Sequence, residues 1–120
     1  MDISATIAIM KQDPAFAENV GMVLIHNGIV RGWSRDDHRS VEQLEVTVDA
    51  VKVESIRYTT ERLPGIYKVK VETRQGVMQP GDDLLFLIVA GDIREHVKPA
   101  LATLLERLKT EAIHKKEVIR

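Results

Sequence analysis

The strongest structural signal in this chain is a continuous apolar run followed directly by an amphipathic pattern. Residues 84–90 are apolar at every position, which is typical of a strand buried on both faces. Beyond this run, apolar side chains recur at helical spacing at Val97, Leu101, Leu104, Leu105 and Leu108. We therefore expect a long C-terminal helix whose leucine stripe packs into the core and does not form a binding groove.

The sequence does not determine at which residue this helix begins. Asp92 and Glu95 have the spacing of a capping box, which favours a start near Asp92. Pro99 lies inside the pattern, where proline removes one backbone hydrogen bond and clashes with the preceding turn. The helix therefore either kinks at Pro99 or begins later than Asp92.

The first forty residues contain alternating and turn-rich patterns. Apolar residues alternate with small polar ones over residues 3–9, and this period of two predicts a first strand. Asp13-Pro14 favours a short helix toward residue 20. Residues 22–30 predict a buried strand with a bulge or close approach at Gly28. The polar stretch 32–40 predicts an exposed loop.

The middle of the chain predicts two more strands and a helix between them. Residues 41–48 have strand character, and residues 67–71 alternate apolar side chains with lysine as a half-exposed strand does. Asp49 is a suitable N-cap for a helix that Pro64-Gly65 would end. Residues 75–83 predict a connection to the buried apolar run.

Length and composition predict one soluble domain spanning residues 1–120 of the 120-residue chain. Residues 111–120 either fold back over a site or form a mobile tail. The chain contains no cysteine, which fits a reducing compartment, and no secretory signal pattern opens it. We therefore expect a cytoplasmic protein. A net charge of −1 and few aromatic residues argue against a nucleic-acid partner, and no apolar stretch suggests a membrane partner.

The four histidines do not predict a metal site. No pair has helical i, i+3 or i, i+4 spacing with a carboxylate nearby, and no thiolate is present. We expect no metal and no cofactor, because the chain also lacks a phosphate-binding loop, a dinucleotide-binding glycine pattern and a nucleophile elbow.

Six short motifs occur in a fixed order between about residue 21 and residue 117. They are Gly28-Ile-Val-Arg31, Val41-x-x-Leu44-Glu45, Thr73-Arg74-Gln75-Gly76 with Pro80-Gly81-Asp82, Ile93-Arg94, Lys109, and Ala112-Ile-His-Lys-Lys-Glu117. In this order the chain resembles the catalytic (large) subunit family of molybdopterin synthase, as a divergent member. The resemblance implies an α+β fold of the α/β-hammerhead-like type, with a mostly antiparallel sheet, a long C-terminal helix and a homodimer.

The resemblance also implies an activity and its partners. In the family, a ubiquitin-like small subunit carries a thiocarboxylated C-terminal Gly-Gly, and its sulfur is transferred to cyclic pyranopterin monophosphate to give molybdopterin. By this likeness Lys109 and Lys115 are catalytic, and Arg31, Arg94 and Lys116 bind substrate. Lysine and arginine suit such a site because both reactants are anionic. Lys109 could act as a general acid or base, or as a transient nucleophile.

Several positions depart from the family pattern. Thr73 and Ile93 stand where the family has histidines, and Ala112 and His114 replace a proline and a tryptophan. A one-residue deletion leaves either Lys115 or Lys116 as the second site lysine, and the motif favours Lys115. Whether the chain turns over substrate is therefore open.

Alternative interpretations of these residues remain. A lysine in the last turn of a helix is favoured by the helix dipole alone, and single surface arginines often form only weak ion pairs. The chain could also be a degenerate paralogue that binds a carrier tail or a pterin without turnover. A third alternative is a non-catalytic homodimeric interaction domain that uses exposed sheet edges.

Overall fold

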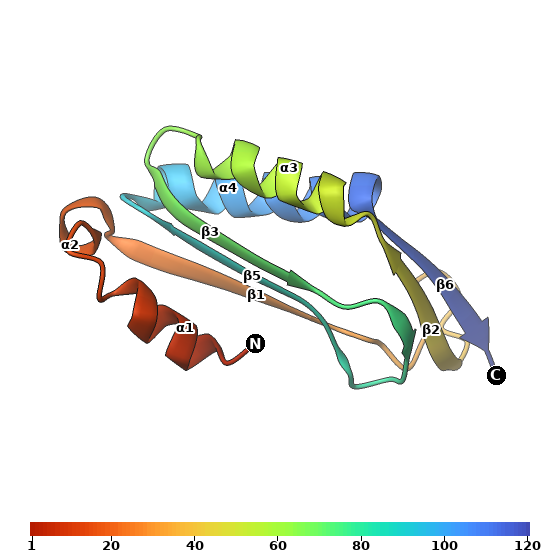
Figure 1. Ribbon diagram of the computed structural model, residues 1–120. Helices are drawn as coiled ribbons and strands as arrows, with labels where there is room; N and C mark the ends of the chain where they lie inside the picture. The colour runs from red at the N-terminus through yellow and green to blue at the C-terminus, as the bar shows by residue number, and fades with distance from the viewer.

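Two antiparallel three-stranded sheets form the frame of the protein (Figure 1). The computed structural model describes residues 1–120. The larger sheet has the order β1 (Met22–Ile29), β5 (Asp83–Gly91), β3 (Ile66–Thr73), and the smaller sheet has the order β4 (Gly76–Met78), β2 (Val41–Val48), β6 (Ile113–Ile119). The predicted α+β class with mainly antiparallel strands is confirmed.

Helices cover both faces of the larger sheet (Figure 1). The helices α3 (Ala50–Glu61) and α4 (Arg94–Arg107) lie on one face, and α1 (Ile3–Met10) lies on the other, followed by the short α2 (Phe16–Asn19). β5 is the central strand, and the helices cover both of its faces, so every residue from Leu84 to Gly91 is buried. The predicted buried strand over residues 84–90 is confirmed.

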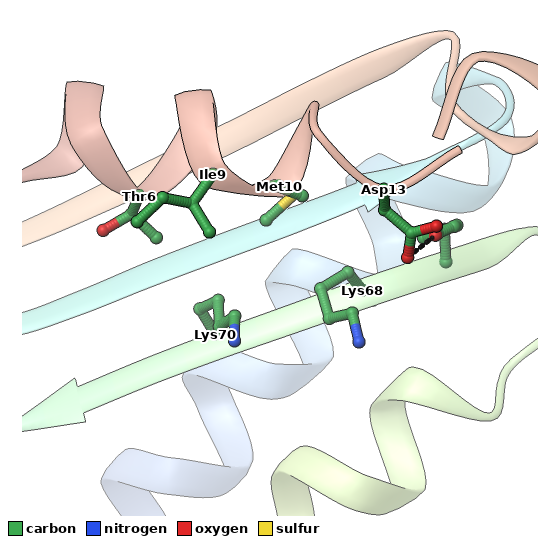
Figure 2. A pocket seen from close by; sticks show the side chains of 7 residues that line it. Thr6, Ile9, Met10, Asp13, Lys68 and Lys70 are labelled. Atoms are coloured by element: carbon green, nitrogen blue, oxygen red, sulfur yellow. Dashed lines mark hydrogen bonds between the residues drawn. The ribbon is translucent and has the colours of Figure 1, made fainter. Parts of the chain in front are cut away.

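The predicted strand over residues 3–9 is wrong, because this segment forms α1. The apolar residues of this segment fit the two-residue period of a strand, but they also fit the period of a helix, since Ile3, Ile7 and Met10 share one helical face. The Asp2 side chain accepts a hydrogen bond from the backbone N–H of Ala5 at 3.0 Å, which caps the helix. Figure 2 shows α1 lying over the sheet. Met10 forms a small buried cluster with Ile88 and Ala90 of β5. The packing of α1 on the sheet therefore decides in favour of the helix over the strand.

β1 is an edge strand and is not buried on both faces as expected. Its register with β5 shifts between Gly28 and Ile29, which confirms the predicted bulge. Leu24 packs against the core, whereas Ile25 and Ile29 on the other face are 43% and 53% exposed. One side of the strand is therefore available to solvent or to another chain.

The helix from residue 50 forms as its end signals predict. The Asp49 carboxylate accepts a hydrogen bond from the Lys52 N–H at 3.0 Å, and the helix ends at Glu61, shortly before Pro64. Gly65 has a positive φ of 79°, a conformation that glycine adopts without strain. Ile56 and Thr60 are buried toward the core.

α4 begins at Arg94, which settles the question of its start. Ile93 is the N-cap and makes no side-chain capping bond, so the predicted capping box does not form. The Asp92 carboxylate instead accepts a hydrogen bond from the Ile93 N–H and lies 2.8 Å from the His96 ring. Pro99 stays inside the helix. Beyond Arg107 the chain continues as a five-residue π-helical turn, η1 (Leu108–Ala112).

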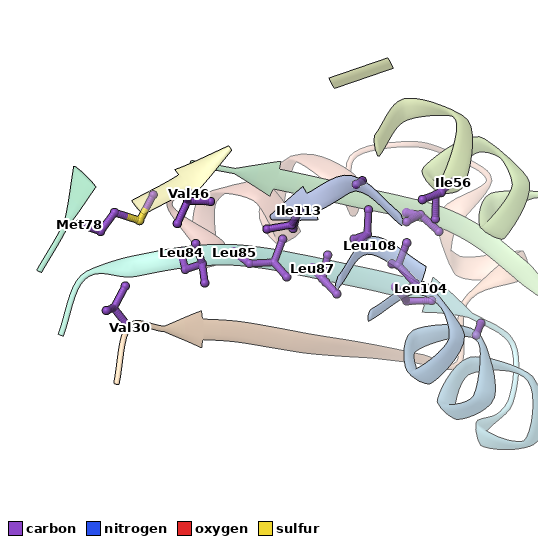
Figure 3. Close-up of a cluster of buried hydrophobic side chains, with 14 of the residues drawn as sticks. Val30, Val46, Ile56, Met78, Leu84, Leu85, Leu87, Leu104, Leu108 and Ile113 are labelled. Atoms are coloured by element: carbon purple, nitrogen blue, oxygen red, sulfur yellow. The ribbon is translucent and has the colours of Figure 1, made fainter. Parts of the chain in front are cut away.

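The leucine stripe of α4 is core, as expected. Val97, Leu104 and Leu108 are fully buried, and Leu101 and Leu105 pack at the edge of the same cluster. Figure 3 shows this cluster continuing from α4 and β5 to Val46 and Ile113 of the smaller sheet. One apolar core therefore joins the two sheets and holds the smaller sheet at the end of the larger one.

Both strands that flank β2 lie in segments where no strand was predicted. The connection 75–83 contains β4, which pairs with β2 opposite Leu44, Glu45 and Val46. Of the two arrangements open for residues 111–120, the structure shows the folded-back one, because β6 pairs with β2 along its length. No helix has the length and apolar composition needed to cross a membrane.

Candidate functional site

A cavity of about 650 Å³ lies where the two sheets and the C-terminal helix meet. Its walls come from the end of β1, the loop that follows β1, the turn η1 and strand β6. Buried apolar side chains contribute part of the lining: Val30, Leu44, Leu84 and Leu85. Because these residues belong to the core that joins the sheets, the shape of the cavity depends on that packing.

Three of the cations predicted from the sequence line this cavity. Arg31 follows β1, Lys109 lies in η1 and Lys115 lies in β6, so the fold brings together positions that are far apart in the chain. Arg35 is a fourth cation in the lining, and the carboxylates of Asp36 and Glu117 are also present. None of the four cations forms an ion pair within the chain. We call this site the cationic cavity.

Lys115 is the lysine whose charge the cavity most clearly disfavours. Partial burial lowers the pKa of Lys115, and repulsion from Lys109 and Arg31 lowers it further, while Glu117 acts in the opposite direction. The alternation of β6 places Lys115 on the same face as the buried Ile113, which explains the partial burial. Lys115 therefore loses its proton more readily than an ordinary surface lysine.

Arg31 is supported by the loop between β1 and β2. Its guanidinium carbon lies 5.1 Å from the centroid of the Trp33 ring, within the range of a cation–π interaction. The Trp33 ring in turn stacks on His38, with centroids 4.8 Å apart and planes at 10°. Two bridging contacts close the loop: Trp33 pairs with Ser40, and the Ser34 N–H donates to the Arg39 carbonyl at 2.8 Å. The segment 32–40, which was predicted only as an exposed loop, thus supports Arg31 through the Trp33 ring.

Two predicted substrate-binding residues lie outside the cavity. Arg94 is in the first turn of α4, is exposed, and pairs with Glu95 at 3.3 Å. It is roughly 22 Å along the helix from Lys109, given a rise of about 1.5 Å per residue. Lys116 is exposed opposite Glu45 in the smaller sheet, on the other face of β6 from Lys115. Within one chain, Arg31 and Lys115 therefore share the cavity and Arg94 does not, and between the two terminal lysines the structure favours Lys115.

The sequence interpretation missed two residues of the cavity. Arg35 lies in a loop whose path cannot be read from local patterns. His26 was considered only as a metal ligand, yet it lines the cavity from β1. No group of three or more His, Asp or Glu side chains is arranged to hold a metal ion. The replaced motif positions Thr73 and Ile93 do not line the cavity.

The two antiparallel sheets, the long C-terminal helix and the cationic cavity define an α+β protein of the molybdopterin-synthase type. The sequence profile of the family described as "MoaE protein" matches residues 1–111. The chain therefore belongs to the MoaE family, and the resemblance drawn from the motif order is confirmed. Its role lies in molybdenum cofactor biosynthesis.

Solved structures agree with this family. Molybdopterin synthase from Staphylococcus aureus is 25% identical with a TM-score of 0.71, over 84% of this chain and 76% of that one. Molybdopterin cofactor biosynthesis protein E from Burkholderia multivorans is 25% identical with a TM-score of 0.74, over 100% of this chain and 82% of that one. A complex of subunits 1 and 2 of molybdopterin-converting factor from Helicobacter pylori shares the fold, at 21% identity and a TM-score of 0.68, over 100% and 80% of the two chains. Comparison with individually curated proteins gives no match.

Proposed function

We propose that this chain is the large subunit of a cytoplasmic molybdopterin synthase. In this role it transfers sulfur from the thiocarboxylated Gly-Gly C-terminus of a ubiquitin-like small subunit to cyclic pyranopterin monophosphate. The observation that carries the proposal is the convergence of Arg31, Lys109 and Lys115 in one cavity. This is the arrangement that a site for two anionic reactants requires.

Each of these residues has a chemical role that fits its surroundings. Arg31 is suited to hold the phosphate, because its planar guanidinium offers several donors and is oriented by Trp33. Lys115 is suited to exchange a proton during the reaction, because burial and repulsion favour its neutral form. Lys109 lies in the same cavity and supplies a second amine near the reacting groups. Arg94 and Lys116 do not line this cavity.

The proposal includes two protein partners. The small subunit would insert its C-terminal tail into the cationic cavity, where the carboxylate-like terminus meets positive charge. The Helicobacter pylori complex of subunits 1 and 2 supports a partner of this kind. A homodimer is supported by the open edge of β1 and by the exposed Ile25 and Ile29 on one face of that strand. Light scattering should therefore give twice the mass of the chain.

A reconstituted sulfur-transfer assay tests the function. Purified protein is mixed with thiocarboxylated small subunit and cyclic pyranopterin monophosphate, and molybdopterin is quantified. We expect turnover by the wild-type chain, a large loss in Lys115→Ala and Lys109→Ala, and near-normal turnover in Lys116→Ala, which is the matched control outside the cavity. No product from a folded wild-type chain would overturn the catalytic role and favour binding without turnover.

A further inference from the structure

The π-helical turn η1 presents Lys109 to the cationic cavity, and burial holds only the inner side of this turn. The Ile113 N–H donates to the Leu108 carbonyl five residues earlier, which closes the turn. Leu108 and Ala112 are fully buried, and Figure 3 shows Leu108 among the core side chains. Lys109 lies between them in the chain and is exposed toward the cavity. Single π-helical turns are rare and often occur at functional sites, so the restraint on the outer side of η1 bears on Lys109.

Three charged side chains restrain η1 from outside the cavity. The Arg107 guanidinium donates to both oxygens of the Glu111 carboxylate, at 2.8 Å and 3.2 Å. The Lys52 amine on α3 lies 3.8 Å from the same carboxylate. None of these three residues lines the cavity. The Glu111 carboxylate therefore ties η1 to the end of α4 and to the start of α3, and we call the three residues the Glu111 clamp.

The clamp is formed by charged groups whose geometry is well defined. Hydrogen bonds from Arg107 lower the pKa of Glu111, and the positive charges of Arg107 and Lys52 lower it further, against the opposing effect of desolvation. Two hydrogen bonds between a guanidinium and a carboxylate also fix their relative orientation. The Arg107 and Glu111 side chains are 36% and 33% exposed, so the pair adds little to global stability and acts mainly on the local placement of the turn.

We propose that Glu111 is a positioning residue, which keeps Lys109 close to Lys115 in the cationic cavity. Both lysines line this cavity, and neither forms an ion pair within the chain. Like charges move apart unless the fold prevents it. The clamp supplies this constraint, because it holds the turn that carries Lys109 from two neighbouring helices. The inference rests on the proposed function for the use of the two amines in turnover, whereas the clamp itself requires no ligand.

The titration of Lys115 reports whether Lys109 is held close. After burial, repulsion from Lys109 is the largest cause of the lowered pKa of Lys115. If Glu111→Gln releases η1, Lys109 moves away and the pKa of Lys115 rises toward the ordinary value of 10.5. A purely electrostatic effect has the opposite sign, because the loss of a nearby negative charge makes a lysine easier to deprotonate. The direction of the change therefore separates positioning from a simple charge effect.

NMR titration of the lysine side chains in the free protein provides the first test. Wild type is compared with Glu111→Gln and with the control Glu106→Gln, which removes the same charge from an exposed residue of α4 that forms no ion pair. We expect a raised pKa of Lys115 in Glu111→Gln and no rise in Glu106→Gln. A pKa of Lys115 that stays the same or falls in Glu111→Gln would overturn the inference, as would equal rises in both variants.

Turnover in the reconstituted sulfur-transfer assay provides the second test. Glu111→Gln and Arg107→Gln should each lower kcat roughly three- to tenfold with little change in KM, because a misplaced group acts on the chemical step more than on substrate binding. The double variant should be no slower than the slower single variant, since both changes break one clamp. Additive losses would overturn this shared role.

Two observations separate the inference from its alternatives. Melting temperatures of the variants should stay near that of wild type, and a large drop would assign the clamp to global stability and overturn the positioning role. Absence of turnover in wild type, together with the expected rise in the Lys115 pKa in Glu111→Gln, would overturn the proposed function and support the clamp.

Discussion

Replacing Lys115 by glutamine should make the protein more stable at neutral pH and less active. Lys115 is held near Lys109 and Arg31 without an ion pair, and burial and their repulsion lower its pKa. A lysine whose pKa is lower in the folded protein than in the unfolded chain binds protons less readily when folded. Its charged form therefore opposes folding, and glutamine removes that opposition while keeping a similar side-chain length.

The size and pH dependence of the effect follow from the same argument. Lys115 keeps much of its solvent exposure and Glu117 attracts it, so screening limits the gain to about 1 kcal/mol or less. For a domain of this size that corresponds to a rise in melting temperature of about 3 to 5 °C at most. The unfavourable contribution of Lys115 to the stability of wild type should diminish as the pH approaches the ordinary lysine value of 10.5, because the folded protein releases the Lys115 proton first. The difference in stability between wild type and Lys115→Gln should therefore shrink as the pH rises toward 10.5.

Thermal unfolding of wild type, Lys115→Gln and the control Lys116→Gln between pH 7 and pH 10.5 provides the measurement. Turnover and phosphate binding are measured on the same preparations. The reasoning would be refuted by a lower melting temperature of Lys115→Gln at pH 7, or by a stability difference that stays constant with pH. It would also be refuted if Lys116→Gln behaved in the same way, since Lys116 lies outside the cavity.

Three further predictions concern the site and the core. Trp33→Ala should weaken phosphate binding, measured by calorimetry, about two- to fivefold, because a cation–π contact at an exposed site contributes about 0.5–1 kcal/mol to the placement of Arg31. Trp33→Phe should recover most of the lost affinity. Lys109→Arg should retain phosphate binding but lose turnover, because arginine keeps the positive charge and does not release a proton at working pH. Equal turnover in wild type and Lys109→Arg would contradict a chemical role for Lys109. Leu104→Ala should lower the free energy of unfolding by about 2–5 kcal/mol in denaturant titration, because Leu104 is fully buried between α4 and the sheet. The control Ala102→Gly, on the exposed face of the same helix, should lower it by only about 1 kcal/mol.

Elements with agreeing local signals were predictable from the sequence. The helix after Asp49 has a capping residue at its start and Pro64-Gly65 at its end, and both signals act as predicted. The apolar run 84–90 was correctly predicted as a buried strand because a fully apolar run of this length is typical of a strand covered on both faces and is short for a helix. In contrast, residues 3–9 satisfy the period of a strand and that of a helix, so local pattern alone could not choose between them.

The candidate site was predictable in part. The motif order pointed to Arg31, Lys109 and Lys115, and the fold brings these three residues together. The same reasoning named Arg94, which does not line the cavity of its own chain, because a motif records which residues occur and not which end of a helix faces a cavity. Neither Arg35 nor the role of Trp33 carried any local signal.

The sequence by itself determined the family, most of the elements and the residue types of the site, because these depend on short-range periodicity, capping and motif order. Only the tertiary structure decided the state of residues 3–9, the strand character of the C-terminal segment and the membership of the cavity. These features depend on contacts between segments far apart in the chain: α1 against the outer face of the sheet, and β6 against β2. The pairing of β6 with β2 places Lys115 inside the cavity and Lys116 outside it, because successive side chains of a strand point to opposite faces.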